Sequence, residues 1–135
     1  MAGRLVVNVD GGSRGNPGPA AVGVVVSSAE GEVLDEVAET IGEATNNVAE
    51  YEALLRGIGR AKELGASELE LIGDSELVVR QVQGRYKVKQ EHLRPLHARV
   101  LRELMEIDSW SIRHVRREEN AAADDLVNAA LDGAR

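Results

Sequence analysis

The sequence predicts an α/β fold: a five-stranded mixed sheet, with three antiparallel strands and two parallel ones, flanked by helices. Three β-branched segments come first along the chain, and two later apolar segments each follow a helical pattern. Early strands joined by short turns can pair antiparallel, whereas a strand that follows a helix needs a crossover and adds in parallel. At 135 residues, the chain is expected to form one domain, residues 1–135, with a substantial core.

Hydrophobic periodicity and turn residues give the expected elements in the order βββαβαβα. Asn46 and Asn47 can cap the first helix, which is expected to end near Leu64, just before Gly65. The expected strands cover residues 4–10, 20–28, 32–42, 69–72 and 110–115. The expected helices cover residues 46–64, 75–83, 90–106 and 119–131.

Composition excludes several classes of protein. The chain contains no cysteine, which excludes disulfides and thiolate metal sites. It has no apolar run long enough to span a membrane, and too few residues precede the first strand for a secretory signal. We therefore expect a cytoplasmic protein. With no Phe and only Trp110, Tyr51 and Tyr86 as aromatics, the core must be aliphatic, and base stacking is not expected as the binding mode.

Charge is unevenly distributed along the acidic chain, whose net charge is −7. Residues 30–76 hold thirteen acidic and three basic side chains, whereas residues 75–102 hold seven basic and two acidic ones. A second basic group, with Arg113, His114, Arg116 and Arg117, precedes the last helix. Such residues are often merely solvated, but two basic clusters in an acidic chain favour an anionic ligand.

Asp10 and Asp74 each follow an apolar strand and precede small or polar residues. In LVVNVDGGSRGNPGPAAVG, residues 5–23, the residues after Asp10 predict a tight, exposed turn; the plain alternative is a hairpin with a solvated aspartate. If the two strands are neighbours, both carboxylates lie at one edge. Their repulsion would raise one pKa unless a divalent cation neutralised them. Oxygen ligands without cysteine favour Mg²⁺ or Mn²⁺.

Two helices offer further carboxylates. Asp124 borders the apolar stripe of the last helix and can lean over the sheet edge, whereas Asp125 points away together with Asn128 and Asp132. On the first helix, Glu50 and Glu52 flank opposite sides of the apolar face. Periodicity does not choose between these two glutamates.

Four motifs along the chain together resemble type 1 ribonuclease H: VDGGSRGNPGPAAVG, TNNVAEYEAL, GDSELV and EENAAADDLVNAAL. Their order and spacing match across nearly the whole chain. The resemblance implies a ribonuclease H-like fold and a catalytic, metal-binding tetrad of Asp10, Glu50, Asp74 and Asp124. It also selects Glu50 over Glu52.

The resemblance implies hydrolysis of the RNA strand of RNA–DNA hybrids with two ions of Mg²⁺ or Mn²⁺, leaving 5′-phosphate and 3′-hydroxyl ends. Recognition of RNA requires a contact to its 2′-hydroxyl, and Thr45 matches a position that holds a DNA-strand phosphate in the family. The expected substrate contacts near the tetrad are Gly11, Gly12, Ser13, Gly15, Asn16, Thr45, Asn46, Asn47, Glu76 and Asn120. No protein partner is implied, and a monomer is expected.

Two departures from the family pattern concern substrate binding. Glu76 stands where better-known bacterial enzymes carry Gln, so a donor becomes an acceptor. The chain is also too short after Gln83 for their long basic protrusion, and Arg85, Lys87 and Lys89 form a reduced substitute. This compact form resembles archaeal and some Gram-positive or actinobacterial members, and weaker substrate binding is expected.

A third departure concerns a loop that carries a catalytic histidine in many members. Counting back from Asn120 without gaps puts His114 at that position. Aligning the strand instead makes His114 a packed strand residue and leaves Arg116 or Arg117 to act in the loop. We prefer this alignment, because His114 continues the alternation of Trp110 and Ile112.

Two other functions remain open: a nuclease of the same fold acting on double-stranded RNA or junctions, and a non-catalytic nucleic-acid-binding module.

Overall fold

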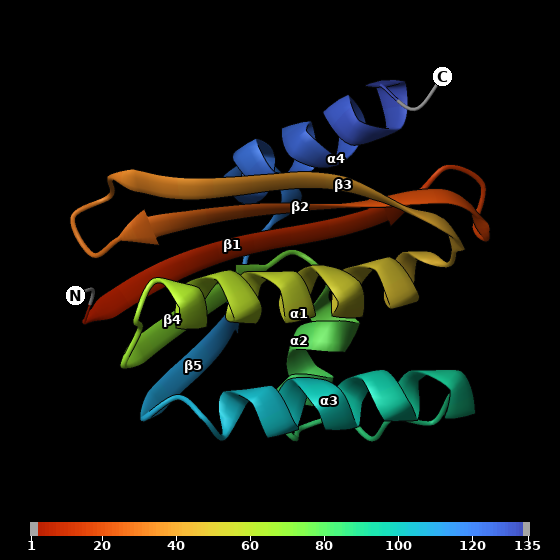
Figure 1. Ribbon diagram of the computed structural model, residues 1–135. Helices are drawn as coiled ribbons and strands as arrows, with labels where there is room; N and C mark the ends of the chain where they lie inside the picture. The colour runs from red at the N-terminus through yellow and green to blue at the C-terminus, as the bar shows by residue number, and fades with distance from the viewer. Residues whose placement is uncertain (1–2, 134–135) are drawn as a thin grey trace.

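The computed structural model describes residues 3–133 and contains one five-stranded sheet in the order β3-β2-β1-β4-β5 (Figure 1). The strands are β1 (Arg4–Ser13), β2 (Gly18–Ser28), β3 (Val33–Ala44), β4 (Glu68–Gly73) and β5 (Ser109–His114). The helices are α1 (Asn46–Glu63), α2 (Glu76–Val82), α3 (Arg94–Leu104) and α4 (Ala121–Gly133). The predicted fold class is confirmed.

Strand pairing follows the connections. β1, β2 and β3 pair antiparallel through short turns, while β4 pairs parallel to β1 and β5 parallel to β4. Both parallel strands are reached through helical crossovers, as this geometry requires. The crossover from β4 to β5 contains both α2 and α3, so the order is βββαβααβα. The predicted order βββαβαβα is wrong at this point, because it counted the two helices of this crossover as one.

Helices cover both faces of the sheet. Figure 1 shows α4 on one side and α1, α2 and α3 on the other. The larger core, between the sheet and α1–α3, is aliphatic apart from buried Tyr51, as the composition predicts. A smaller cluster lies between the other face of the sheet and α4 and contains Ala21 of β2 with Val127 and Leu131 of α4. Gly23 permits this approach, because a Cβ there would lie 2.2 Å from the Ala123 carbonyl oxygen.

Three predicted boundaries need correction. The predicted turn after Asp10 is wrong at its start: β1 continues through Ser13, because residues 11–13 pair with residues 20–22 of β2. Thr45, not Asn46 or Asn47, caps α1, since its side chain accepts a hydrogen bond from Val48 N. The last helix begins at residue 121, after a 3₁₀ turn over residues 117–120.

Within residues 3–133, no helix is long and apolar enough to cross a membrane.

Candidate active site

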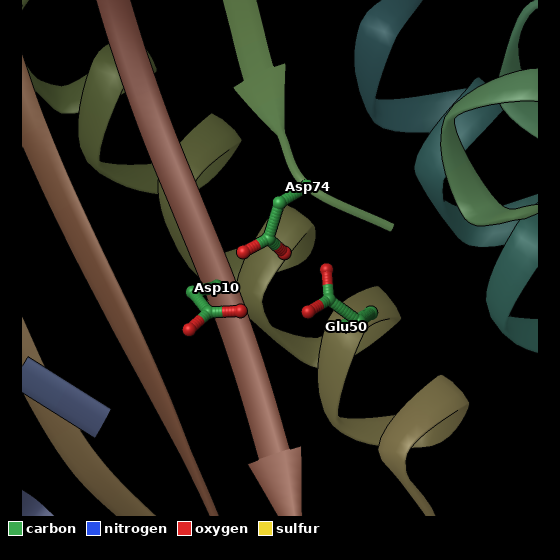
Figure 2. Close-up of side chains that lie close together, drawn as sticks. All are labelled: Asp10, Glu50 and Asp74. Atoms are coloured by element: carbon green, nitrogen blue, oxygen red, sulfur yellow. The ribbon is translucent and has the colours of Figure 1, made fainter. Parts of the chain in front are cut away.

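Three carboxylates from distant parts of the sequence converge at the sheet. Asp10 lies in β1, Asp74 directly follows β4, and Glu50 lies on α1 (Figure 2). One carboxylate oxygen from each residue lies within 4.8 Å of the other two. The parallel pairing of β1 with β4 ends at Val9 and Gly73, so Asp10 and Asp74 come next on neighbouring strands. This register confirms that the two strands are neighbours, as the sequence suggested.

A close approach of α1 to β1 brings Glu50 into the cluster. A Cβ at position 11 would lie 2.2 Å from backbone atoms of Ala49, so only glycine fits there. The Gly11 amide donates a 2.9 Å hydrogen bond to Glu50 Oε1. Glu50 is buried, whereas Glu52 pairs with Arg56 at 2.6 Å. The structure therefore brings Glu50 to the cluster and leaves Glu52 outside it.

Asp124 lies beside the three clustered carboxylates on the first turn of α4. It is half-buried and lines a cavity of about 430 Å³ together with Asp10, Glu50 and Asp74. Asp125 is exposed, as the helical spacing predicts. Asn128 also lines this cavity, contrary to the expectation that it points away. Its i, i+4 spacing from Asp124 places both on one face of the helix, a signal available in the sequence.

Burial and mutual repulsion control protonation of the cluster. Burial, with the nearby charges of Asp74 and Asp124, raises the pKa of Asp10 from 3.8 to about 7. Burial and the charge of Asp10 raise the pKa of Glu50 well above its usual value, although the Gly11 amide opposes this shift. Buried carboxylates at this spacing are unfavourable together when ionised. An all-oxygen donor set of this kind fits a divalent hard cation, which would relieve the repulsion.

Arg117 is the basic side chain that the structure brings to the cavity from the segment before α4. Its Nη2 lies 3.4 Å from Asp124 Oδ1, and the charge of Asp124 raises the arginine's pKa. Arg116 and His114 are exposed, and neither lines the cavity. His114 is the last residue of β5, which agrees with the strand alignment, but the expectation that it packs inside is wrong.

The expected substrate contacts are only partly gathered around this cavity. Those that line it are Gly11, Gly12, Ser13, Asn46 and Asn47. Ser13 N donates to Asn46 Oδ1 at 2.8 Å, and Asn46 N donates to Asn16 Oδ1 at 3.0 Å. These bonds join the end of β1 to the start of α1.

The other expected contacts lie outside the cavity lining. The Thr45 hydroxyl oxygen caps α1, and Glu76 accepts a 2.8 Å bond from Arg80. Asn120 is buried; its Nδ2 donates to the Val9 carbonyl and its Oδ1 accepts from Asn8. The expected substrate contact of Asn120 is therefore not supported, because its side chain ties the 3₁₀ turn to β1.

Sequence reasoning missed two polar residues of the cavity besides Asn128. Ser75 lines it and also caps α2 by accepting from Val78 N. Arg14 lines it from the residue just after β1 and pairs with Asp132 at 2.8 Å. The adjacency of Ser75 to Asp74 was an available signal, whereas the Arg14–Asp132 contact depends on how α4 packs.

The basic loop, defined here as residues 85–89 between α2 and α3, lies apart from the carboxylate cavity. Arg85, Lys87 and Lys89 are exposed in it. Together with Tyr86 and Gln81 they line a separate cavity of about 520 Å³. The protein therefore has a positively charged surface at the basic loop, separate from the negatively charged carboxylate cavity.

Comparison with known proteins agrees with this geometry. A family model described as reverse transcriptase-like matches residues 8–130. The chain is 47% identical over 132 residues to ribonuclease HI of Halobacterium salinarum, covering 98% of this chain and 66% of that protein. It is 45% identical to a bifunctional protein of Mycobacterium tuberculosis, covering 97% of this chain and 36% of that protein. The chain thus spans about two thirds of the first relative and about a third of the second.

Solved structures give the same result. The crystal structure of RNase H1 from Halobacterium salinarum matches with a TM-score of 0.94 at 46% identity, covering 96% of this chain and 98% of that one. The structure of LC11-RNase H1 in complex with RNA/DNA hybrid matches with a TM-score of 0.92, also at 46% identity and with the same coverage. The fold, the converging carboxylates and these similarities all point to one family. The chain belongs to the ribonuclease HI family.

Proposed function

We propose that this protein is a metal-dependent endonuclease that hydrolyses the RNA strand of RNA–DNA hybrids and leaves 5′-phosphate and 3′-hydroxyl ends. The observation that carries the proposal is the cluster of Asp10, Glu50 and Asp74, whose oxygens lie within 4.8 Å of one another. Relatives named ribonuclease HI, and a similar enzyme solved with RNA/DNA hybrid, support the substrate class.

Two ions of Mg²⁺ or Mn²⁺ are the proposed cofactors, held by Asp10, Glu50, Asp74 and Asp124. When bound, such ions supply an activated water and stabilise the leaving 3′ oxygen of a phosphodiester. Asp10 lies in the paired part of β1, and Glu50 accepts a hydrogen bond from the Gly11 amide. Asp124, on α4, lies at the half-exposed border of the cavity and pairs with Arg117 at 3.4 Å.

Arg117 is proposed to hold the scissile phosphate or to help the product leave. Its guanidinium stays charged at any working pH, so it cannot serve as a general base near neutrality. In the described structure Arg117 is paired with Asp124. A substrate phosphate would compete with Asp124 for the N–H donors of the Arg117 guanidinium. Arg116 and His114 are assigned lesser roles, because neither lines the cavity.

Selection of RNA is proposed to rest on residues around the cavity mouth, which approach the 2′-hydroxyls. The proposed contacts that line the cavity are Gly11, Gly12, Ser13, Asn46 and Asn47. Gly15, Asn16 and Glu76, outside its lining, are proposed as further contacts, with Thr45 on the DNA strand. The Thr45 oxygen accepts from Val48 N, which leaves its hydroxyl hydrogen to donate to a phosphate. The basic loop is proposed to neutralise backbone phosphates.

The test compares cleavage of three duplexes with one sequence: RNA–DNA hybrid, double-stranded RNA and double-stranded DNA. Each duplex is labelled at one 5′ end and incubated with Mg²⁺, with Mn²⁺ or with chelator. We expect the RNA strand of the hybrid to be cut only when a metal is present. Faster cutting of duplex RNA would indicate the alternative nuclease activity, and binding without cutting would indicate a non-catalytic module; either result refutes the proposal.

We further propose that residues 1–135 form a single domain that acts as a cytoplasmic monomer. The single sheet and its shared core support the first statement. The relatives from Halobacterium salinarum and Mycobacterium tuberculosis, which are prokaryotes without a nucleus, support the location. Light scattering with and without hybrid tests the monomer, and a dimeric mass would refute it.

A further inference from the structure

A buried polar connection runs from the helix that carries Glu50 to the basic loop. Tyr51 follows Glu50 on α1 and is fully buried. Its hydroxyl donates a 2.5 Å hydrogen bond to Oε1 of Gln81, a residue of α2 that is also buried. Gln81 Nε2 in turn reaches the carbonyl oxygen of Lys87 at 3.4 Å. Two consecutive hydrogen bonds, from Tyr51 to Gln81 and from Gln81 to Lys87, therefore link α1 to the backbone of the basic loop.

His97 on α3 packs against the same connection. Its ring meets the Tyr51 ring edge-on, with centroids 6.3 Å apart and an interplanar angle of 90°. Its Nε2 lies 3.0 Å from the backbone oxygen of Gln81. The helices α1, α2 and α3 thus meet at Tyr51 and Gln81.

A polar pair in this aliphatic core needs a physical reason. A phenylalanine would fill the Tyr51 site without a buried hydroxyl to satisfy, and an apolar side chain could fill the Gln81 site. Burial raises the pKa of Tyr51, so its hydroxyl stays protonated and donates. The bond satisfies the Tyr51 hydroxyl and the Gln81 Oε1 atom, and removing either side chain's polar group leaves the other of these two atoms unpaired. The pair fixes the relative position of two helices more sharply than apolar contact alone.

The basic loop has other attachments at its two ends. The amides of Arg85 and Tyr86 donate to the Arg80 carbonyl at 2.9 and 3.2 Å. Arg94 Nε donates to the Val88 carbonyl at 3.1 Å. The bond from Gln81 acts between these attachments, at Lys87, which is one of the three cationic residues of the loop.

We propose that Tyr51 and Gln81 are positioning residues that hold the basic loop at a fixed place relative to the carboxylate site and so set affinity for the hybrid backbone. The inference rests on the proposed function, because it assigns the loop to phosphate binding. It predicts an effect on KM and not on kcat, since neither side chain lines the carboxylate cavity.

The test uses Tyr51→Phe, Gln81→Leu and the double variant Tyr51→Phe/Gln81→Leu. Each single variant leaves one buried polar group unpaired, which lowers stability by itself. The double variant removes both groups, so urea unfolding should return toward the wild-type midpoint. Gln83→Leu is the matched control, because Gln83 lies just after α2 but donates its 2.8 Å bond to Ile112 of β5 instead of the loop.

Two readouts separate positioning from general stability. In the double variant we expect KM for the hybrid to rise about three- to tenfold with kcat nearly unchanged, a range that matches the loss of one hydrogen bond. We also expect faster trypsin cleavage after Arg85, Lys87 and Lys89. Gln83→Leu should change neither readout. A double variant with wild-type KM and wild-type trypsin sensitivity would overturn the proposal.

The trypsin assay needs no substrate, so it distinguishes two kinds of failure. If the wild-type protein cuts no hybrid, the proposed function fails, and trypsin sensitivity alone still reports whether Tyr51 and Gln81 hold the loop. If the double variant does not fold, Tyr51→Phe carries the comparison, because it removes one oxygen atom and keeps the packing. An unchanged KM and trypsin rate in that variant would also refute the inference.

Discussion

Replacing Asp10 by Asn should stabilise the metal-free protein while it abolishes cleavage. Asp10 is 6% exposed and its pKa is raised from 3.8 to about 7 by burial and by neighbouring carboxylates. At about 1.4 kcal/mol for each tenfold change in ionisation, holding the charge at pH 8 costs the native state about 4 kcal/mol. Asn keeps the shape without the charge. We therefore expect a gain of about 2–4 kcal/mol at pH 8.

The sign of the pH dependence follows from the raised pKa. Between pH 3.8 and about 7 the native state binds more protons at Asp10 than the unfolded state does, so stability falls as pH rises through this window. The advantage of Asp10→Asn should therefore be small at pH 4 and full at pH 8. Asp125→Asn, at an exposed position on α4, is the matched control and should change stability by less than about 0.5 kcal/mol.

The assay is urea unfolding of wild type and both variants in chelator at pH 4 and pH 8, followed by cleavage of the hybrid in saturating Mg²⁺. Loss of a metal ligand should lower the rate by at least about a hundredfold. Equal stability of Asp10→Asn and wild type at pH 8, or the same difference at both pH values, would refute the electrostatic reasoning. Retention of more than about a tenth of the wild-type rate would refute the ligand assignment.

Three further predictions concern the substrate. A hybrid with 2′-deoxy substitutions around the scissile phosphate should resist cleavage but still bind, since phosphate contacts remain; equal cutting would contradict this. Changing all three cations of the basic loop to Ala should raise KM, flatten its salt dependence and leave kcat nearly unchanged, whereas a fall in kcat alone would place them at the chemistry. Single-turnover rates should fall more for Arg117→Ala than for Arg116→Ala or His114→Gln, because Arg117 contacts Asp124. The largest loss in His114→Gln, with an unaltered fold, would favour the gapless alignment instead.

Much of the site could be predicted because it depends on short-range patterns. The apolar runs before Asp10 and Asp74 define two strands, and a mixed sheet can make those strands neighbours; their register then brings the two carboxylates together. The orientation of Asp124 relative to Asp125 follows from helical spacing alone.

What could not be predicted depends on contacts between distant segments. Gly11 reads as a turn residue, but pairing with β2 keeps it in a strand and the tight contact with Ala49 requires it to lack a side chain. Glu50 and Glu52 are equivalent by periodicity, and only the family resemblance chose Glu50. The physical reason for that choice is the close packing of α1 against β1, which no local pattern shows. The bond from Tyr51 to Gln81 spans 30 residues of sequence and depends on how α1 and α2 meet.

The most direct test of the central claim is the chemistry of the product ends. Wild-type protein is incubated under single-turnover conditions with a hybrid labelled on both strands, in Mg²⁺ and in chelator. Hydrolysis by water at a cluster of metal-bound carboxylates predicts cutting of the RNA strand only, only with metal, and with 3′-hydroxyl ends. Cleavage that persists in chelator, or that leaves 2′,3′-cyclic phosphate ends, would contradict the account, because the RNA's own 2′-hydroxyl would then be the nucleophile.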